Sequence, residues 1–217
     1  MIPVRKQLIR ALIATCLGMV IVSAVLLTLL VHFVPIASTD IFLSREIQGV
    51  GGGPFLFLMK AISIWGDAGV STITVVGAAI FFIAIQYQRE ALFVLLTFFT
   101  DALGVFLKEF VARPRPETPL VTVYQIIEGY SFPSGHVLHY VVFFGLLFVF
   151  MVVIKSLPFA VRVGIGTLSL FLILTISVSR VYLGSHWASD VIGGYLFGSL
   201  MLLALLWAYF GIVNRTG

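Results

Sequence analysis

The chain has 217 residues, of which 60% are hydrophobic and 10% charged, with a formal net charge of +4 and a mean hydropathy of +1.15. Soluble domains contain only about 45–50% apolar residues, so this composition excludes an ordinary soluble protein and predicts a membrane protein. The length allows one helical bundle but not a bundle with a sizeable soluble domain, and we expect residues 1–217 to form a single domain.

Six apolar runs are long enough to cross the hydrocarbon core as helices, which takes around 20 residues. They cover approximately residues 11–34, 69–87, 91–111, 137–154, 161–182 and 187–212. The first run exceeds the usual apolar region of a signal peptide, and no cleavage site of small residues follows it, so we interpret it as a permanent span. The sequence predicts an all-α, polytopic membrane bundle of six transmembrane helices.

The connection between the first two expected spans contains Gly51-Gly52-Gly53-Pro54, followed by a mostly apolar run over residues 55–66. This run is too short to cross a membrane. It is interpreted either as an interfacial helix that shapes lipid entry or as a packed connection.

Orientation follows from the lysines and arginines of the short connections, since cytoplasmic loops retain positive charge. With six crossings, the following basic residues lie on the same side as the N-terminus: Arg5, Lys6, Arg10, Arg89, those of the loop 155–162 and Arg215. The opposite side receives Arg45, Lys60, Arg113 and Arg115. The balance predicts that both termini are cytoplasmic.

The same crossing order brings three polar clusters, distant in sequence, to one face of the bundle. Their members are Lys108 and Arg115, then Ser134, Gly135 and His136, then Arg180, His186 and Asp190. With cytoplasmic termini, this face is extracytoplasmic. Loops without a shared role have no need to converge in this way, so the clusters predict a functional site.

Lys108 and Arg115 flank the end of the third expected span, and Pro114 and Pro116 prevent the helix from continuing. The lysine is then held on a span while the guanidinium projects from a stiff stretch, so two cations can approach one oxyanion from different directions. The alternative is that cations at a span end reach the lipid headgroups, which is our interpretation of Arg113.

Ser134-Gly135-His136 follows Pro133 and precedes an apolar helix, so Ser134 is a candidate N-cap. Helix N-termini bind phosphate, and a glycine lets the backbone approach an anion. His136 then lies in the first turn, placed to give a proton to a leaving oxygen. A capped helix start with an interfacial histidine is the alternative, and His139, one turn later, is interpreted as a packing residue.

Arg180 closes the fifth expected span and His186 opens the sixth, with Asp190 four residues beyond His186 on the same helical face. A carboxylate there can accept the Nδ1 proton of the imidazole, which leaves a free lone pair on Nε2. His186 is therefore a candidate nucleophile. The nearby Arg180 favours this interpretation over a purely structural hydrogen bond.

Asp101 lies within the third expected span, where an unpaired charge costs roughly 3 kcal/mol. We expect it to face protein, either in a structural contact or in a polar network below the site. The single Cys16 excludes an intrachain disulfide.

Three motifs, Lys108-x6-Arg115-Pro116, Pro133-Ser134-Gly135-His136 and Ser179-Arg180-x5-His186-x3-Asp190, together resemble the tripartite signature of the type 2 phosphatidic acid phosphatase (PAP2) superfamily. The match spans about residues 108–190. The layout of six spans is similar to the integral-membrane lipid phosphatase branch, in particular to bacterial phosphatidylglycerophosphate phosphatase B proteins.

This resemblance implies a metal-independent phosphatase that uses no cofactor. His186 would attack phosphorus in line and form a phosphohistidine, Asp190 would orient His186, and His136 would protonate the leaving group and later activate water. The phosphate oxygens would be held by Lys108, Arg115, Ser134, Gly135 and Arg180.

The implied substrate is a phosphorylated lipid of a bacterial plasma membrane, with phosphatidylglycerophosphate and undecaprenyl diphosphate as the candidates. Phosphatidic acid and diacylglycerol pyrophosphate are alternatives, and a vanadate haloperoxidase would use the same groups, although such relatives are soluble. A non-catalytic lipid-binding protein is the remaining alternative, but binding alone needs no aligned nucleophile and acid. The expected partners are the bilayer and its lipid substrate, with no nucleic acid and no obligate protein partner.

Overall fold

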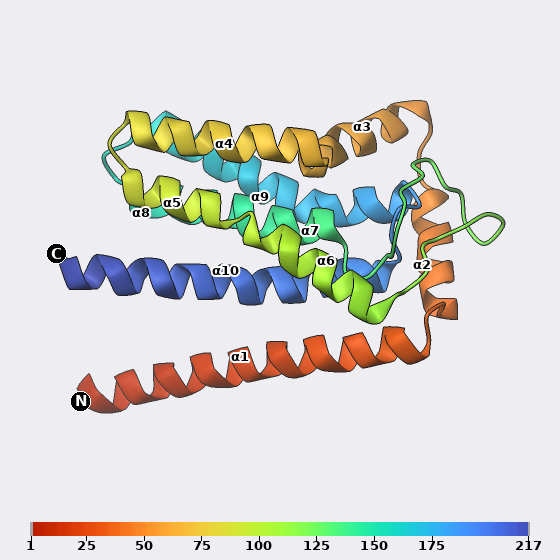
Figure 1. Cartoon of the computed structure of the whole chain (residues 1–217), viewed down its shortest axis with the longest axis horizontal. Helices are drawn as coiled ribbons and strands as arrows, with labels where there is room; N and C mark the ends of the chain where they lie inside the picture. Colours follow the sequence, from red (N-terminus) through yellow and green to blue (C-terminus); the bar gives the residue numbers. More distant parts are fainter. Residues whose placement is uncertain (1, 217) are drawn as a thin grey trace.

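The computed structural model describes residues 2–216, and the side chains of residues 7–9 and 11–212. Arg5, Lys6, Arg10 and Arg215, on which the expected charge balance partly depends, have side chains outside this set. Every regular element of the described residues is helical, which confirms the all-α class. Most of the helices run along one axis of an elongated bundle (Figure 1).

The helices carry the labels of Figure 1. In chain order they are α1 (Ile2–Phe33), α2 (Ser38–Gln48), α3 (Gly53–Ser63), the 3-10 turn η1 (Ile64–Gly66), α4 (Ala68–Ala84), α5 (Gln88–Leu96), α6 (Phe99–Val111), α7 (Gly135–His139), the π-helical turn η2 (Tyr140–Phe144), α8 (Gly145–Val153), α9 (Phe159–Tyr182) and α10 (Ala188–Thr216).

Within the described residues, five helical segments are long and apolar enough to cross a membrane, and they coincide with five of the six expected spans. They are Gln7–Phe33, Gln88–Val111, Gly135–Val153, Phe159–Tyr182 and Ala188–Ile212.

The expected second span, residues 69–87, corresponds to the shorter helix α4, which has 17 residues. At about 1.5 Å per residue α4 is about 26 Å long, slightly less than the hydrocarbon core of about 30 Å. In Figure 1 α4 runs along the bundle from the α3 end to the α5 end. Both chain termini lie at the same end of the bundle (Figure 1).

Helix α2, which the sequence analysis did not predict, lies across the other end of the bundle (Figure 1). The chain bends by 118° between α2 and the segment that begins with α3. Gly51 permits this bend, because its φ is +97° and a Cβ there would lie 2.6 Å from the Cβ of Phe55. The apolar run expected at 55–66 forms most of α3 and η1. It packs against α9, where Ser179 Oγ donates to the carbonyl of Met59 at 2.6 Å.

The third expected span is interrupted rather than continuous. Helix α5 ends at Leu96 and α6 begins at Phe99. Thr97 Oγ1 donates to the carbonyl of Val94, and Thr100 Oγ1 donates to the carbonyl of Thr97, both at 2.6 Å. Such bonds compete with the helical backbone and bend helices, which accounts for the interruption.

The segment α7–η2–α8 is the most buried of the five candidate spans, and α10 packs closely on its first half. Gly194 of α10 permits this approach, because a Cβ there would lie 2.9 Å from the carbonyl oxygen of Ser134. Small residues let helix backbones come close in membranes. Since α10 carries Asp190 and α7 carries His136, this contact sets the separation of two of the polar clusters.

We predict that Gly194→Ala destabilises the protein by about 1–3 kcal/mol, the usual effect of overpacking, because the opposing atom is backbone and cannot rotate away. Gly211→Ala is the matched control on the same helix, since nothing lies within 4 Å of a Cβ at that position. Thermal unfolding of the detergent-solubilised variants measures the difference. Equal unfolding temperatures for the two variants would contradict the close packing.

Candidate active site

The three polar clusters meet at the end of the bundle opposite to the two chain termini (Figure 1). Each comes from a different pair of elements. Lys108 lies in the last turn of α6, and Arg115 lies in the connection that follows. Ser134, Gly135 and His136 begin α7. Arg180 lies in the last turn of α9, His186 in the link to α10, and Asp190 in the first turn of α10.

A cavity of about 270 Å³ lies among these elements. Five of the expected site residues line it: Lys108, Arg115, Gly135, His136 and His186. The other three, Ser134, Arg180 and Asp190, are fully buried. The remaining lining residues are Gly66, Ala68, Ser71, Thr72, Asp101, Ile127 and His139.

His186 is 2% exposed, and polar groups lie near both of its ring nitrogens. Nε2 lies 3.4 Å from Nη1 of Arg115, which also donates to the carbonyl of Ser185 at 2.8 Å. Nδ1 lies 3.4 Å from Ser131 Oγ and 3.7 Å from Asp190 Oδ2. The longer separation exceeds a hydrogen bond, whereas the Ser131 hydroxyl donates to Asp190 Oδ2. Asp190 thus lies on the Nδ1 side of His186, and Ser131 contacts both the imidazole and the carboxylate.

Asp190 is held on both of its oxygens. Oδ2 also accepts from the backbone N–H of Trp187 at 2.8 Å, and Oδ1 accepts from Arg113 Nη1 at 2.5 Å. Arg113 is 1% exposed and further donates to Asp40 Oδ2 at 2.7 Å and to the carbonyl of Pro35 at 2.8 Å. The expectation that Arg113 reaches the lipid headgroups is therefore wrong. Its guanidinium is a buried bridge between α2 and α10.

Sequence reasoning missed this bridge because Asp40 lies in α2, which was itself not predicted, far from Arg113 along the chain. Asp40 is also tied to the start of α10, where Ser189 donates to it from its backbone N–H at 2.9 Å and from Oγ at 2.7 Å. Nothing in the sequence around Asp40 indicated that its carboxylate is buried.

His136 pairs with a second carboxylate that sequence reasoning missed. Its Nε2 lies 3.1 Å from Oδ1 of Asp67, the N-cap residue of α4. The hydrogen bond with His136 holds the pKa of Asp67 below its usual value. Gly66 permits the contact, since any Cβ there would collide with the imidazole. An aspartate directly before an apolar span on the site face was the available signal.

Arg180 and Ser134, which are buried behind the cavity lining, carry unpaired polar atoms. Arg180 Nη1 donates to Ser63 Oγ and to Gln125 Oε1, but its Nε and Nη2 have no partner among the described residues. Ser134 occupies the N-cap position, yet its Oγ makes no capping bond and is likewise unpaired within the described set. A buried polar atom without a partner costs about 1–3 kcal/mol. The oxygens of a bound oxyanion would satisfy these donors.

Lys108 and Arg115 complete the cationic lining. A Cβ at Gly135 would lie 3.6 Å from Lys108 Nζ, so the ammonium group reaches the first turn of α7. Arg115 Nε donates to the carbonyl of Gly129 at 3.0 Å. Burial lowers the pKa of Arg115, but a guanidinium stays charged at neutral pH. Lys108 and Arg115 line the same cavity as His136 and His186, and the buried Arg180 is the third cation of the site.

Two further titratable residues, His139 and Asp101, line the cavity outside the recognised motifs. The ring of His139 is buried and stacks on Phe143 at a centroid distance of 5.3 Å, which agrees with the expected packing role. Asp101 lies in the first turn of α6, is exposed and lines the cavity with Lys108. Asp101 therefore borders the site cavity, and the expectation that it is enclosed by protein is wrong. Among the described residues, no cluster of three His, Cys, Asp or Glu side chains could hold a metal ion.

Burial lowers the pKa of His186 well below its ordinary value of 6.5, and the charges of Arg180 and Arg115 lower it further. The imidazole is therefore neutral at neutral pH in the free protein. Neutral imidazole is the form that has a nucleophilic lone pair.

We predict that the His186 ring is unprotonated at pH 6.5, the midpoint of an ordinary histidine. NMR of protein with ¹⁵N-labelled histidine measures this, and the spectrum of His186→Gln assigns the signal. Arg115→Gln removes one neighbouring cation and should raise the pKa of His186. Half-protonation at or above pH 6.5 in the wild type would contradict the electrostatics described.

Arg113→Met is expected to destabilise the protein by about 3–5 kcal/mol, because Asp40 and Asp190 lose the cation that they share inside the protein. Arg89→Met serves as the control, since Arg89 is exposed at the other end of the bundle. Chemical unfolding in detergent compares the two. A loss no larger than that of the control would show that the bridge is not stabilising.

The sequence model of the PAP2 superfamily matches residues 89–213. Phosphatidylglycerophosphatase B of Bacillus subtilis (strain 168) is 35% identical over 139 residues, which cover 59% of this chain and 62% of that protein. Lipid phosphate phosphatase delta of Arabidopsis thaliana is 32% identical over 118 residues, which cover 50% of this chain and 28% of that protein. The match thus spans less than two thirds of the length of either relative.

Two solved structures share the fold. The crystal structure of a transmembrane PAP2 type phosphatidylglycerolphosphate phosphatase from Bacillus subtilis superposes with a TM-score of 0.74 and 21% identity, covering 93% of this chain and 97% of that one. The crystal structure of Aquifex aeolicus LpxE superposes with a TM-score of 0.59 and 20% identity, covering 78% of this chain and 96% of that one. At these identities the likeness shows the fold alone. The sequence match over more than half of the chain, in a multi-pass helical fold that these structures share, means that the protein belongs to the PAP2 superfamily.

Proposed function

We propose that this protein is a lipid phosphatase that removes the terminal phosphate of phosphatidylglycerophosphate or undecaprenyl diphosphate through a phosphohistidine. The observation that carries the proposal is the environment of His186: a buried, neutral imidazole with Nε2 beside Arg115, in the same cavity as His136. A site that only binds phosphate would gain more from a cationic side chain at this position than from a neutral imidazole. The neutral His186 therefore supports the role of a nucleophile.

In the first step, the Nε2 lone pair of His186 forms a bond to phosphorus while the bond from phosphorus to the leaving oxygen breaks. His136 donates a proton to that oxygen, and the dephosphorylated lipid departs. Asp67 supports this role, because a carboxylate beside His136 stabilises the protonated imidazole. On the other side of His186, Ser131 and Asp190 fix the orientation of the ring.

In the second step, His136 takes a proton from water, and the oxygen of that water attacks phosphorus. The bond between phosphorus and Nε2 breaks, which releases inorganic phosphate and restores the neutral imidazole of His186. Each half of the reaction passes through a transition state whose charge is spread over three phosphoryl oxygens. Preorganised donors around those oxygens stabilise it without rearrangement.

The cations of the site match the charge of this substrate. A phosphate monoester carries about −1.5 to −2 charge at neutral pH. Lys108, Arg115 and Arg180 supply the opposing charge, and the unpaired Nε and Nη2 of Arg180 can donate to the phosphoryl oxygens. In this mechanism no divalent cation is needed to neutralise the substrate.

The distribution of positive charge supports a site that faces away from the cytoplasm. At the site end, Lys108, Arg115 and Arg180 belong to the proposed site and Arg113 to the buried bridge. Arg45 and Lys60 are the cations of this end that have neither role. The terminal end has Arg5, Lys6, Arg10, Arg89, Lys155, Arg162 and Arg215. Because cytoplasmic segments retain lysine and arginine, we propose that the termini are cytoplasmic and that the site opens on the outer face of a bacterial plasma membrane.

The choice between the two substrates rests on separate observations. The similarity to phosphatidylglycerophosphatase B of Bacillus subtilis favours phosphatidylglycerophosphate. An outward-facing site favours undecaprenyl diphosphate, whose terminal phosphate can be removed in the outer leaflet. Phosphatidic acid and diacylglycerol pyrophosphate present the same phosphate chemistry and complete the panel that a test requires.

We predict that the purified protein releases phosphate from this lipid panel in the presence of EDTA, and that His186→Ala lowers the rate by about 10³-fold or more, since loss of a nucleophile costs that much or more in other enzymes with a covalent intermediate. His32→Ala is the matched control, because His32 lies at the same end of the bundle outside the cavity. Rapid quenching with ³²P-labelled substrate should trap an acid-labile phosphoenzyme in the wild type only.

Three results would count against the proposal. Turnover that EDTA abolishes would make the reaction metal-dependent. Undiminished turnover by His186→Ala would remove the phosphohistidine. Binding of these lipids without any phosphate release would favour a non-catalytic lipid-binding protein.

A further inference from the structure

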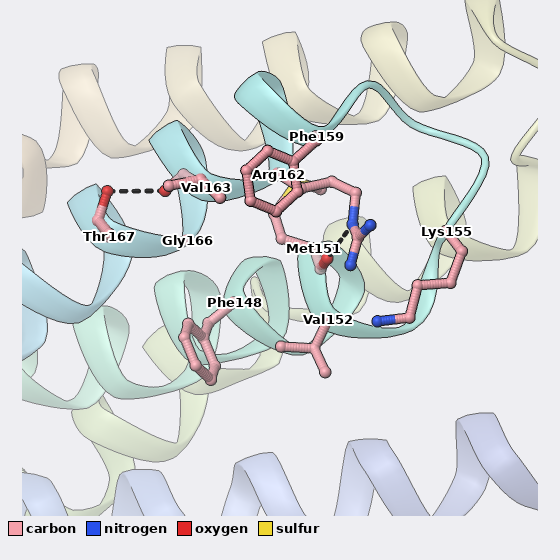
Figure 2. A pocket seen from close by; sticks show the side chains of 9 residues that line it. All are labelled: Phe148, Met151, Val152, Lys155, Phe159, Arg162, Val163, Gly166 and Thr167. Atoms are coloured by element: carbon pink, nitrogen blue, oxygen red, sulfur yellow. Dashed lines mark hydrogen bonds between the residues drawn. The ribbon is translucent and has the colours of Figure 1, made fainter.

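A second cavity, of about 240 Å³, lies at the end of the bundle that holds the two termini (Figures 1 and 2). It is formed by α8, the connection after it and the first turns of α9. Its lining residues are Phe148, Met151, Val152, Lys155, Phe159, Arg162, Val163, Gly166 and Thr167. We propose that this groove binds one anionic phospholipid of the surrounding bilayer, with the phosphate on Lys155 and Arg162 and an acyl chain along the apolar wall.

The polar part of the groove consists of two cations, Lys155 in the α8–α9 connection and Arg162 in the first turn of α9. Figure 2 shows the ammonium group of Lys155 and the guanidinium of Arg162 projecting into the same space. Arg162 Nε donates to the carbonyl of Met151 at 2.7 Å, which fixes the guanidinium plane. Among the described side chains, neither cation forms an ion pair. The two Nη groups are therefore free to donate to a phosphate.

Negative charge that could compensate these cations is scarce at this end. Among the described side chains, Glu90 is the acidic residue of this end, and it is buried and accepts a hydrogen bond from Tyr209 at 2.6 Å. The exposed Arg89 adds a further positive charge. An anionic ligand at Lys155 and Arg162 thus meets attraction without a competing carboxylate, and clusters of basic residues at membrane surfaces recruit anionic lipids in the same way.

The apolar part of the groove favours a lipid over a free anion. Phe148, Val152 and Val163 are 36%, 48% and 44% exposed, so each offers apolar surface to an occupant. Gly166 adds no side chain to this wall, where a Cβ would lie 3.8 Å from both Phe148 and Met151. The groove therefore has cations at the membrane surface and an apolar wall directed toward the bilayer interior, which is the polarity of a phospholipid.

The groove is separate from the active site. Arg162 lies in the first turn of α9 and Arg180 in its last turn. The 18 residues from Arg162 to Arg180 correspond to about 27 Å at about 1.5 Å per residue, which is close to the thickness of the hydrocarbon core of about 30 Å. A phosphate on Arg162 and a phosphate beside Arg180 therefore belong to opposite leaflets. The occupant of the groove is a lipid of the terminal side and not the substrate in waiting.

Photocrosslinking in vesicles tests this proposal. The full-length protein is reconstituted in phosphatidylcholine that contains a trace of phosphatidylglycerol with a photoreactive acyl chain, and crosslinks are mapped with a protease that does not cleave at lysine or arginine. We expect labelling of the segment 148–167 that falls at least five-fold in the double variant Lys155→Gln/Arg162→Gln. Arg89→Gln, which removes an exposed cation of the same end outside the groove, should label as the wild type does.

Two further arms distinguish the sources of the phosphate and the part played by the groove. Unlabelled phosphatidylglycerol should reduce photolabelling of the segment, and millimolar inorganic phosphate should not. If inorganic phosphate reduced the labelling and phosphatidylglycerol did not, the lipid assignment would be overturned. Val163→Trp keeps both cations but fills the groove, and should reduce labelling as strongly as the double variant. Full labelling in either variant, or equal labelling by photoreactive phosphatidylcholine, would overturn the proposal.

Discussion

Burial of charge in a protein of low polarity is the constraint on which the rest of this structure depends. Arg113 is almost inaccessible and is shared by Asp40 of α2 and Asp190 of α10. Isolated charges in such surroundings cost several kcal/mol, so each of the three needs the others. Because Asp190 also binds Ser131, which contacts His186, the same bridge that joins two helices fixes the environment of the proposed nucleophile.

The two ends of the bundle carry positive charge in different ways. At the site end Lys108 and Arg115 are half-buried and line a cavity, and Arg180 is fully buried. Low polarity around these cations makes their interaction with an oxyanion strong. At the terminal end the cations with described side chains, Arg89, Lys155 and Arg162, are exposed or half-buried. The first arrangement suits a reaction that concentrates negative charge, and the second suits orientation in the membrane and contact with anionic lipids.

Sequence reasoning predicted elements and residues with a strong local signal. Apolar runs gave five of the spans, because the need to satisfy every backbone group in hydrocarbon makes helices nearly obligatory there. Motif spacing gave all the cavity-lining cations and both lining histidines that the proposal uses. Apart from Asp67, the misses had only a weak local signal: α2 is a short helix of mixed polar and apolar residues, and the break at Thr97 depends on side-chain bonds within an apolar run.

The sequence by itself therefore determined the all-α membrane fold, the PAP2 resemblance and the meeting of three motifs at one end of the bundle, since hydropathy and crossing order are one-dimensional properties. Only the tertiary structure decided that Arg113 is a buried bridge, that Asp67 pairs with His136 and that Ser131 contacts both His186 and Asp190. Those contacts join residues that are far apart in the chain, and a charged side chain has the same sequence signature whether it reaches water or a buried partner.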